Sequence, residues 1–315
     1  MSITRSSDSG EVRRRWLLGL LGMALTVYAY GVFKSCAVGI APVSLLGWLV
    51  KFWGRGGEYA HGYVVPMISA GMFAWQIRSN PSPLEVRSNP AGLGVVLLAG
   101  VLYWVGVRAS IPRVVAGSLV VLVFGAVLYL AGWAWAKRVW FPCAFLIFMI
   151  PLNFLEQYVS FPLRLFVGSL ATQVLSGIGL DVYHRGTGIY SASGRFPPLD
   201  VADPCSGIRS LVALMALAAL YGYLTMDRPW KKWVVFLSSV PLAVVGNLAR
   251  IATVALVAQG FGSEWAMRIY HDYSGYIVFS LAILCMIALS VALNLRYREL
   301  WHRWVHEEVA RPAVR

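Results

Sequence analysis

Long apolar runs separated by short polar connections dominate the pattern along this chain of 315 residues. A helix needs roughly 17 to 25 predominantly apolar residues to cross about 30 Å of hydrocarbon. The pattern predicts about eight such helices, some of them short or ragged at the ends. We expect them at about residues 16–33, 62–75, 91–107, 114–135, 139–155, 205–226, 233–258 and 274–295. The sequence therefore predicts an all-α polytopic membrane protein.

Composition agrees with this interpretation. The chain is 58% hydrophobic and 13% charged, whereas soluble domains carry about 25% charged residues. In a soluble protein a net charge of +13 would suggest a nucleic-acid partner. Here most of the basic residues lie in the connections between apolar runs, where they determine topology. We therefore expect the partner to be the lipid bilayer, with no nucleic acid bound.

The distribution of basic residues selects one orientation. With the N-terminus in the cytoplasm, sixteen of the 27 Lys and Arg residues lie on the cytoplasmic side and nine on the other, with Arg209 and Arg250 in or at the membrane. Positive charge favours the cytoplasmic side, so both termini are predicted there. The expected organisation is a basic N-terminus at 1–15, one transmembrane domain at 16–295 and a basic tail at 296–315.

Three substantial connections then face outward, at 34–61, 156–204 and 259–273. In the longest of them, apolar residues recur at helical spacing over 161–178, which predicts an amphipathic helix at the membrane interface. Residues 181–203 follow, with Gly186, Gly188, Gly194 and Pro197-Pro198 among β-branched and aromatic residues. This turn-rich stretch predicts a small hairpin that caps a cavity.

A cysteine stands at the start of the sixth apolar run, in Asp203-Pro204-Cys205-Ser206-Gly207-Ile208-Arg209. If the run is helical, Cys205 and Arg209 lie one turn apart on one face. A nearby cation and a helix N-terminus both lower the pKa of a thiol, which favours a nucleophile. The alternative is that Cys205 is a small apolar filler at the end of a membrane span.

Two further polar residues are expected at the same outer face. Arg250 follows seventeen residues that nearly span the hydrocarbon, and His271 immediately precedes the last apolar run. An arginine within a membrane helix is costly and usually faces a wet cavity or a partner. The alternatives are that Arg250 reaches the lipid headgroups and that His271 is a solvated loop residue. Asn247, one turn before Arg250, would orient the guanidinium or pack between helices.

Together these residues suggest a reaction. Cysteine supplies a nucleophile, histidine a base and acid, and arginine a fixed charge for an oxyanion. An acyl-transfer or peptidase reaction at the outer membrane surface follows as a hypothesis. The four cysteines have no CxxC spacing and no adjacent histidine pairs, so we expect no metal, no cofactor and no disulfide framework.

These motifs resemble the exosortase/archaeosortase family. The matching stretches are Cys205 to Ser210, Asn247 to Ile251, His271 with Gly275, and Tyr59-Ala60-His61-Gly62-Tyr63-Val64-Val65-Pro66. The likeness extends over about residues 16 to 295. The residues before Cys205, Asp203-Pro204, differ from the context common in the family, so the recognition motif stays open.

The resemblance implies a membrane-embedded cysteine transpeptidase of the bacterial inner membrane, with its active site facing the periplasm. Its substrates would be exported proteins that end in a PEP-CTERM-like motif, a membrane helix and a basic cluster. Cys205 would be the nucleophile, with Arg250 and His271 as the other catalytic residues. Arg209, Asn247 and His61 would orient the substrate or tune the thiolate. Water, or an amine of a lipid or glycan, would accept the acyl group.

Two other classes of function fit the pattern. A transporter or flippase for envelope polysaccharide would also use several membrane helices and a polar outer cavity. A noncatalytic assembly factor for polysaccharide export would depend on partners and tolerate loss of Cys205. Loss of tail cleavage on replacement of Cys205 would distinguish the enzyme from both.

Overall fold

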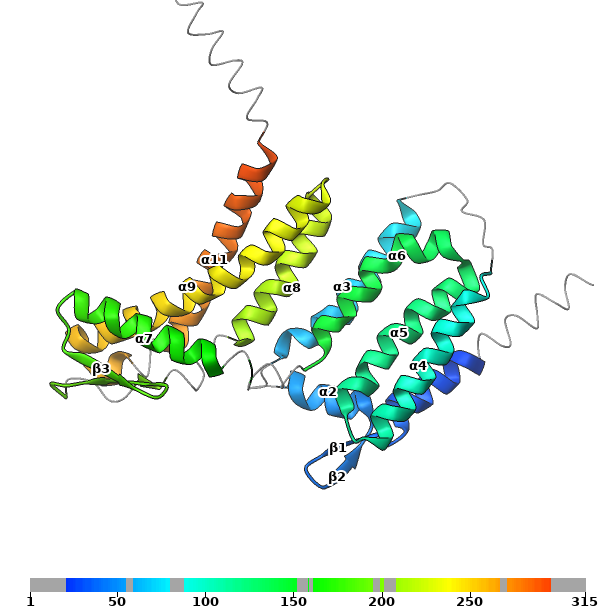
Figure 1. The fold of residues 1–315 in the computed structure, drawn as a ribbon, viewed down its shortest axis with the longest axis horizontal. Helices are drawn as coiled ribbons and strands as arrows, with labels where there is room; N and C mark the ends of the chain where they lie inside the picture. Colours follow the sequence, from blue (N-terminus) through cyan, green and yellow to red (C-terminus); the bar gives the residue numbers. More distant parts are fainter. Residues whose placement is uncertain are drawn as a thin grey trace, which may run out of the picture. The chain divides into compact units, whose positions relative to one another are not determined.

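The computed structural model describes residues 21–54, 59–79, 88–151, 158, 161–194, 199–200, 208–266 and 271–295. Contacts divide the chain into two compact units, Met1–Leu152 and Asn153–Arg315. Each unit is helical, with small antiparallel sheets at the connections (Figure 1).

The first unit contains helices and one β-hairpin. An apolar helix, Leu21–Val32, ends in the π-turn η1 at Tyr28–Val32. The elements that follow are β1 (Cys36–Val38), β2 (Ala41–Val43), α2 (Leu45–Trp53), η2 (Ala60–Tyr63), α3 (Val64–Arg78), α4 (Ala91–Arg108), α5 (Pro112–Ala131), α6 (Trp133–Phe145) and η3 (Leu146–Met149).

Small residues bring α4 and α5 into close contact. The two helices lie side by side (Figure 1), and a Cβ added at Gly125 of α5 would lie 3.0 Å from the backbone nitrogen of Val96. The hydroxyl of Tyr30 lies 2.8 Å from that of Ser118, and Tyr103 donates to the carbonyl of Ala29. These bonds tie the first apolar helix to α4 and α5, because polar groups in an apolar surrounding need partners.

The sequence analysis placed one helix boundary wrongly. It ended the fourth span at residue 135 and put Lys137 and Arg138 in a connection, but the chain turns at Gly132 and α6 already contains both cations. Gly132 has φ 88°, a left-handed backbone conformation that glycine adopts without a Cβ penalty. One residue therefore suffices for the turn.

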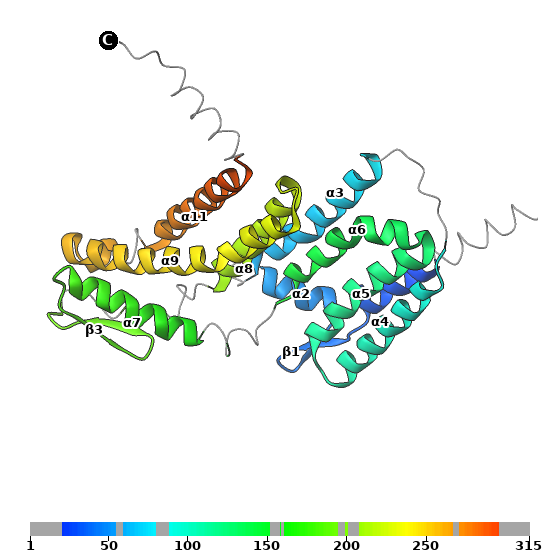
Figure 2. The ribbon, with the colours of Figure 1, turned by 45° about the horizontal axis from the view of Figure 1, so that its top comes forward.

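The second unit is built around one long helix. Its elements are α7 (Phe161–Gly177), β3 (Val182–Arg185), β4 (Gly188–Ser191), β5 (Leu199–Asp200), α8 (Ile208–Thr225), α9 (Pro229–Phe261), α10 (Ser263–Trp265) and α11 (His271–Asn294). Helix α9 has 33 residues, a length of about 50 Å at 1.5 Å per residue. Figure 2 shows it running along the whole unit, with α7 beside one half and α8 beside the other.

Two apolar clusters lie along α9. In the first half, Val235 and Ala243 pack with residues of α8 and α11 that include Leu214 and Met286. In the second half, residues from Ile251 to Ala258 pack against α7 and the β3–β4 hairpin, represented by Leu175 and Ile189. Asn247 and Arg250 occur in the sequence between these halves. The change of partner along α9 therefore coincides with its polar residues.

The helix and hairpin predicted for 161–203 are present. Helix α7 buries Val167, Ala171 and Leu175, which are four residues apart and form one face. Strand β3 pairs with β4 in antiparallel register, Arg185 opposite Gly188, and β4 pairs with β5. Gly186, with φ 62°, makes the tight turn. The hairpin β1–β2 and helix α2 were not predicted.

Four of the described helices are long and apolar enough to cross a membrane: Ala91–Arg108, Pro112–Ala131, Pro229–Phe261 and Tyr273–Asn294. Leu21–Val32 and Ser210–Thr225 are shorter apolar helices. Large apolar side chains cover the outer faces of α4 and α11, including Leu97 at 62% and Leu284 at 60% exposure. Such surfaces require a lipid environment, so the chain is a polytopic membrane protein.

Candidate active site

Arg250 has a defined position at the start of α11. Its Nε donates to the Oγ of Ser274 over 3.2 Å, and Ser274 is 1% exposed. A Cβ added at Gly275 would lie 3.5 Å from the guanidinium carbon. The guanidinium therefore lies against the backbone of α11, held by an acceptor at position 274 beside a residue without a side chain.

A cavity of about 60 Å³ joins three helices beside Arg250. Its polar lining consists of Ser210 from the start of α8 and Asn247 and Arg250 from α9, with Gly275 from the start of α11. Leu214, Val278 and Phe279 provide apolar walls. A cavity of this size with polar groups can hold water or part of a ligand.

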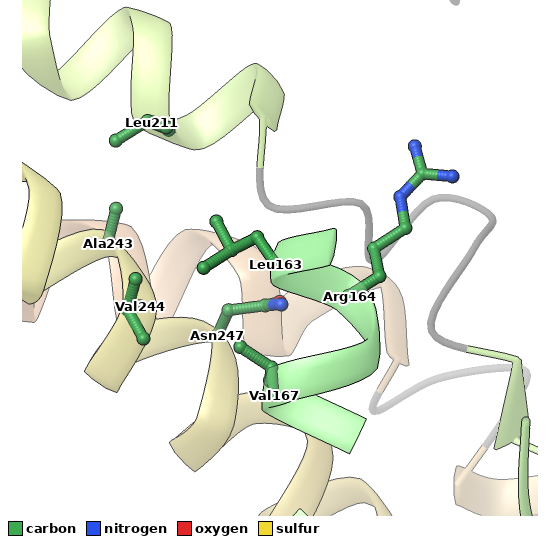
Figure 3. A pocket seen from close by; sticks show the side chains of 7 residues that line it. All are labelled: Leu163, Arg164, Val167, Leu211, Ala243, Val244 and Asn247. Atoms are coloured by element: carbon green, nitrogen blue, oxygen red, sulfur yellow. The ribbon is translucent and has the colours of Figure 1, made fainter. Parts of the chain in front are cut away.

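A second, water-sized pocket of about 10 Å³ lies between α7, α8 and α9 (Figure 3). Leu163 and Val167 of α7 and Leu211 of α8 line it, and the Asn247 side chain reaches into it from α9 (Figure 3). The guanidinium of Arg164 points away from the pocket (Figure 3). Because Asn247 lines both hollows, its amide lies in the wall between them.

The structure brings some of the predicted residues together. Arg250 and Asn247 line the same cavity. Arg209 is the second residue of α8, next to Ser210 of the cavity, and His271 is the first residue of α11, one turn before Gly275. For these two, only the backbone is described. Cys205 lies outside the described residues, five positions before Ser210 in the sequence.

The remaining cysteines have environments unlike that of a nucleophile. Cys36 of β1 is buried, and burial raises the pKa of its thiol above the usual value. Cys143 of α6 is also buried, and Cys285 is exposed on the membrane helix α11. A reactive cysteine needs a lowered pKa, which Cys36 lacks. Within the residues described, no group of three or more His, Cys, Asp or Glu side chains could hold a metal ion.

His61 lies in η2 of the first unit, and the structure does not relate its position to the cavity. Burial lowers the pKa of His61, and a hydrogen bond with the backbone of Phe148 opposes that effect. Its Nε2 is buried and has no hydrogen-bond partner in the described part of the chain. The ring lies against Tyr59, with centroids 5.6 Å apart. These contacts favour a neutral imidazole with one nitrogen available to a donor.

The sequence analysis missed Ser274 as a site residue. A single hydroxyl in an apolar helix gives no signal, because most such residues bond their own helix backbone. Its position between His271 and Gly275, both noted from sequence, was the available clue. Only the packing of α9 against α11 identifies it as the acceptor for Arg250.

Most of these residues lie in a stretch of the chain that matches a known protein family. The sequence model of the transmembrane exosortases, Exosortase_EpsH, matches residues 53–288. This chain belongs to the transmembrane exosortase family. The matched exosortase region contains α8, α9 and the part of α11 that holds Ser274 and Gly275. No curated protein and no solved structure matches the chain.

Membership of the exosortase family implies a multi-pass membrane protein that processes PEP-CTERM sorting signals. Exosortases are generally considered cysteine-dependent transpeptidases, and their substrates are PEP-CTERM proteins. The cavity between α8, α9 and α11 is the candidate site for this exosortase activity.

Proposed function

We propose that this protein is a membrane-embedded cysteine transpeptidase or endopeptidase. It would cleave the C-terminal sorting signal of exported proteins at the outer face of the cytoplasmic membrane. Cys205 would act as the nucleophile, with Arg250 and His271 as the other catalytic residues. Arg209, Asn247 and His61 are proposed to support substrate binding or thiolate formation.

The observation that carries this proposal is the cavity beside Arg250. Ser210, Arg250 and Gly275 line it together, so the first turns of α8 and α11 and the guanidinium meet at one place. Cys205 precedes the first of these turns in the sequence, and His271 opens the second. This convergence supports the proposal, because in the reaction a nucleophile, a base and a cation must act on one carbonyl.

The length of α9 supports an active site at the membrane boundary. Trp230, Lys231 and Lys232 stand at its start, and Lys231 and Lys232 each lie over an aromatic ring, as residues at a membrane surface do. Arg250 is twenty residues further on, about 30 Å along a helix. That distance equals the hydrocarbon thickness, so Arg250 would lie at the opposite boundary, where α7 and the hairpin form a cap.

We further propose the full topology predicted from sequence. Four helices reach the length of a membrane span, and each of the other four predicted spans contains a helix in the part that the structure describes. With both termini in the cytoplasm, the substrate's own membrane helix would lie beside the enzyme and hold its cleavage motif at the outer surface. Such anchoring supplies proximity without a deep pocket.

The proposed chemistry follows cysteine acyl transfer. The Cys205 thiolate would attack the scissile carbonyl carbon, and Arg250 would stabilise the oxyanion that forms. His271 would give a proton to the leaving amine as the C–N bond breaks, which leaves a thioester on Cys205. Water or an acceptor amine would then attack this thioester and return the thiol.

Co-expression with a substrate that carries a motif, a membrane helix and a basic tail tests the proposal. Cys205→Ala and Cys205→Ser should both insert but leave the tail uncleaved, since a serine hydroxyl is rarely ionised. Cys285→Ala is the matched control, because Cys285 is an exposed thiol on α11 that does not line the cavity, and its loss should leave cleavage unchanged. Normal cleavage by either Cys205 variant would reject the mechanism and favour an assembly factor or transporter.

A further inference from the structure

The start of α6 combines cations with tryptophans. The Nζ of Lys137 lies 5.4 Å from the centre of the Trp133 ring, and the Cζ of Arg138 lies 5.5 Å from the centre of the Trp135 ring. Trp133 and Trp140 are each more than half exposed. Tryptophan with lysine or arginine is typical of a membrane–water boundary.

The position of α6 in the unit agrees with such a boundary. Helix α5, a candidate membrane span, ends at Ala131, and the turn at Gly132 starts α6 at the same end. Ser69 of α3 donates to the carbonyl of Pro142 near the other end of α6. Helices α3 and α6 therefore run antiparallel, which brings Arg78 at the end of α3 to the start of α6.

Two buried donors at this end have no acceptor among the residues that the structure describes. The Nε1 of Trp135 and an Nη of Arg138 are both buried and have no hydrogen-bond partner within the described chain. Buried donors without acceptors are costly and rare in proteins. The residues are three apart on one helix, so their side chains share a face. An acceptor from outside the described chain would satisfy both.

The described part of this unit supplies no counter-charge for Arg138. Residues 21–54, 59–79 and 88–151 contain no aspartate and no glutamate. The connection between α3 and α4 carries one acidic residue, Glu85. Its carboxylate is the competing candidate acceptor for Arg138. Water could accept both hydrogen bonds but would leave the charge of Arg138 without an anion.

We propose that Trp135 and Arg138 bind the phosphate of an anionic phospholipid headgroup where α5 ends and α6 begins. Arginine suits this ligand because its planar group pairs with two phosphate oxygens, and the indole N–H supplies one further donor. By helix rise the two residues lie about 3 and 8 Å from the start of α6, the depth of headgroups at a membrane boundary. The proposal does not depend on the peptidase chemistry.

Titration of the purified full-length protein in detergent tests this site. The probes are short-chain phosphatidylglycerol, short-chain phosphatidylcholine and inorganic phosphate, and the readouts are the shift in melting temperature and the lipid retained in native mass spectrometry. Wild type should bind phosphatidylglycerol. Arg138→Gln should bind it about tenfold more weakly than wild type, and Trp135→Phe about threefold more weakly. Arg138→Lys keeps the charge without the planar group and should fall between wild type and Arg138→Gln.

Arg108→Gln is the matched control, since Arg108 is an exposed arginine. It is the last residue of α4, whereas the proposed lipid site lies near the first residues of that helix. Its affinity for phosphatidylglycerol should stay within about twofold of wild type. Equal losses in Arg108→Gln and Arg138→Gln would overturn the proposal and indicate attraction to net charge alone. Equal stabilisation by inorganic phosphate would replace the lipid with a free anion. If no probe changes the melting temperature, and Glu85→Gln lowers it as much as Arg138→Gln does, Glu85 is the acceptor for Arg138 and the lipid proposal is wrong.

Discussion

Ser274 determines how Arg250 is presented to the cavity. The Nε of Arg250 donates to the Ser274 hydroxyl over 3.2 Å, and Arg250 lines the cavity. A hydrogen bond to a charged group contributes about 1.5 to 3 kcal/mol. Loss of this acceptor would weaken the interaction that holds the side chain against α11.

Replacing Ser274 should therefore slow substrate cleavage without preventing insertion. Ser274→Ala and Ser274→Cys both remove a good acceptor, and we expect cleavage of a tailed substrate to fall about tenfold. Ser274→Thr keeps the hydroxyl and should retain most of the activity. The measurement is the cleavage rate at several substrate levels, normalised to inserted protein. Equal losses in the Cys and Thr variants would mean that packing, and not the acceptor, matters at this position.

The partly buried His61 should make stability depend on pH. Burial lowers the pKa of His61 below its usual 6.5, so the unfolded chain binds a proton more readily than the folded one. The contribution of His61 is fully present above that usual pKa and is lost as the pH falls toward the folded pKa. The melting temperature of the wild type should be lower at pH 5.5 than at pH 8, and this difference should be smaller in His61→Gln.

His184 provides the control for this measurement, because it is an exposed residue on β3. His184→Gln should keep the wild-type loss between the two pH values. If His61→Gln loses as much stability as wild type on acidification, another group titrates, and His61 is not buried as a neutral base.

Polar residues that are conspicuous in an apolar helix were the ones that the sequence could point out. Arg250 and Asn247 were found because a charge or an amide inside an apolar helix is conspicuous and costly, and both line the cavity. The roles of these two residues, and those of Cys205, Arg209, His271 and His61, remain proposals. Ser274 and Trp135 were missed because a hydroxyl or an indole is common in membrane helices. What distinguishes them is the hydrogen bond that Ser274 accepts from Arg250 and the absence, within the described residues, of an acceptor for the Trp135 indole N–H.

The helices themselves followed closely from hydropathy, while the connections did not. A run of apolar residues must be helical to satisfy its backbone in lipid, so each predicted span has a helix in its described part. The turn at Gly132 was missed because the residues on both sides are helical and aromatic. Helix α2 was missed because it lies in a connection of the pattern, although it buries Leu45, Trp48, Leu49 and Trp53.

Packing of α9 against α11 depends on a glycine. A Cβ added at Gly246 would lie 2.9 Å from Cγ1 of Val278, and a β-branched valine cannot easily move away. Overpacking in Gly246→Ala should therefore destabilise the second unit by about 1 to 3 kcal/mol. The higher helix propensity of alanine should offset about 1 kcal/mol of this loss. The measurement is the melting temperature of the purified protein in detergent.

A double-mutant cycle isolates this contact. Val278→Ala creates the space that the new methyl group needs, so Gly246→Ala should cost less in that background than in wild type. Gly260→Ala is the control on the same helix, because a Cβ there meets nothing within 4 Å. Strict additivity of the two changes would show that Gly246 and Val278 are not in contact.

The two units differ in how they use the membrane. The first unit has no acidic residue in its described part and has a cluster of tryptophan, lysine and arginine at the start of α6, consistent with anchoring. The second unit contains the cavity. In this unit the second half of α9 packs against α7 and the hairpin. A division of labour follows as a hypothesis, with one unit held by lipid and the other assembled for the reaction.

Labelling with a membrane-impermeant maleimide in intact cells tests the proposed orientation of both units. In a background without the four native cysteines, Ser193→Cys reports on the exposed end of β4, and Ser79→Cys reports on the exposed end of α3. We expect labelling at 193 and protection at 79, because basic residues keep the connection after α3 in the cytoplasm. Both positions should react after lysis. Labelling at 79 with protection at 193 would invert the topology and leave the cavity beside Arg250 on the cytoplasmic side, where exported substrates do not present their tails.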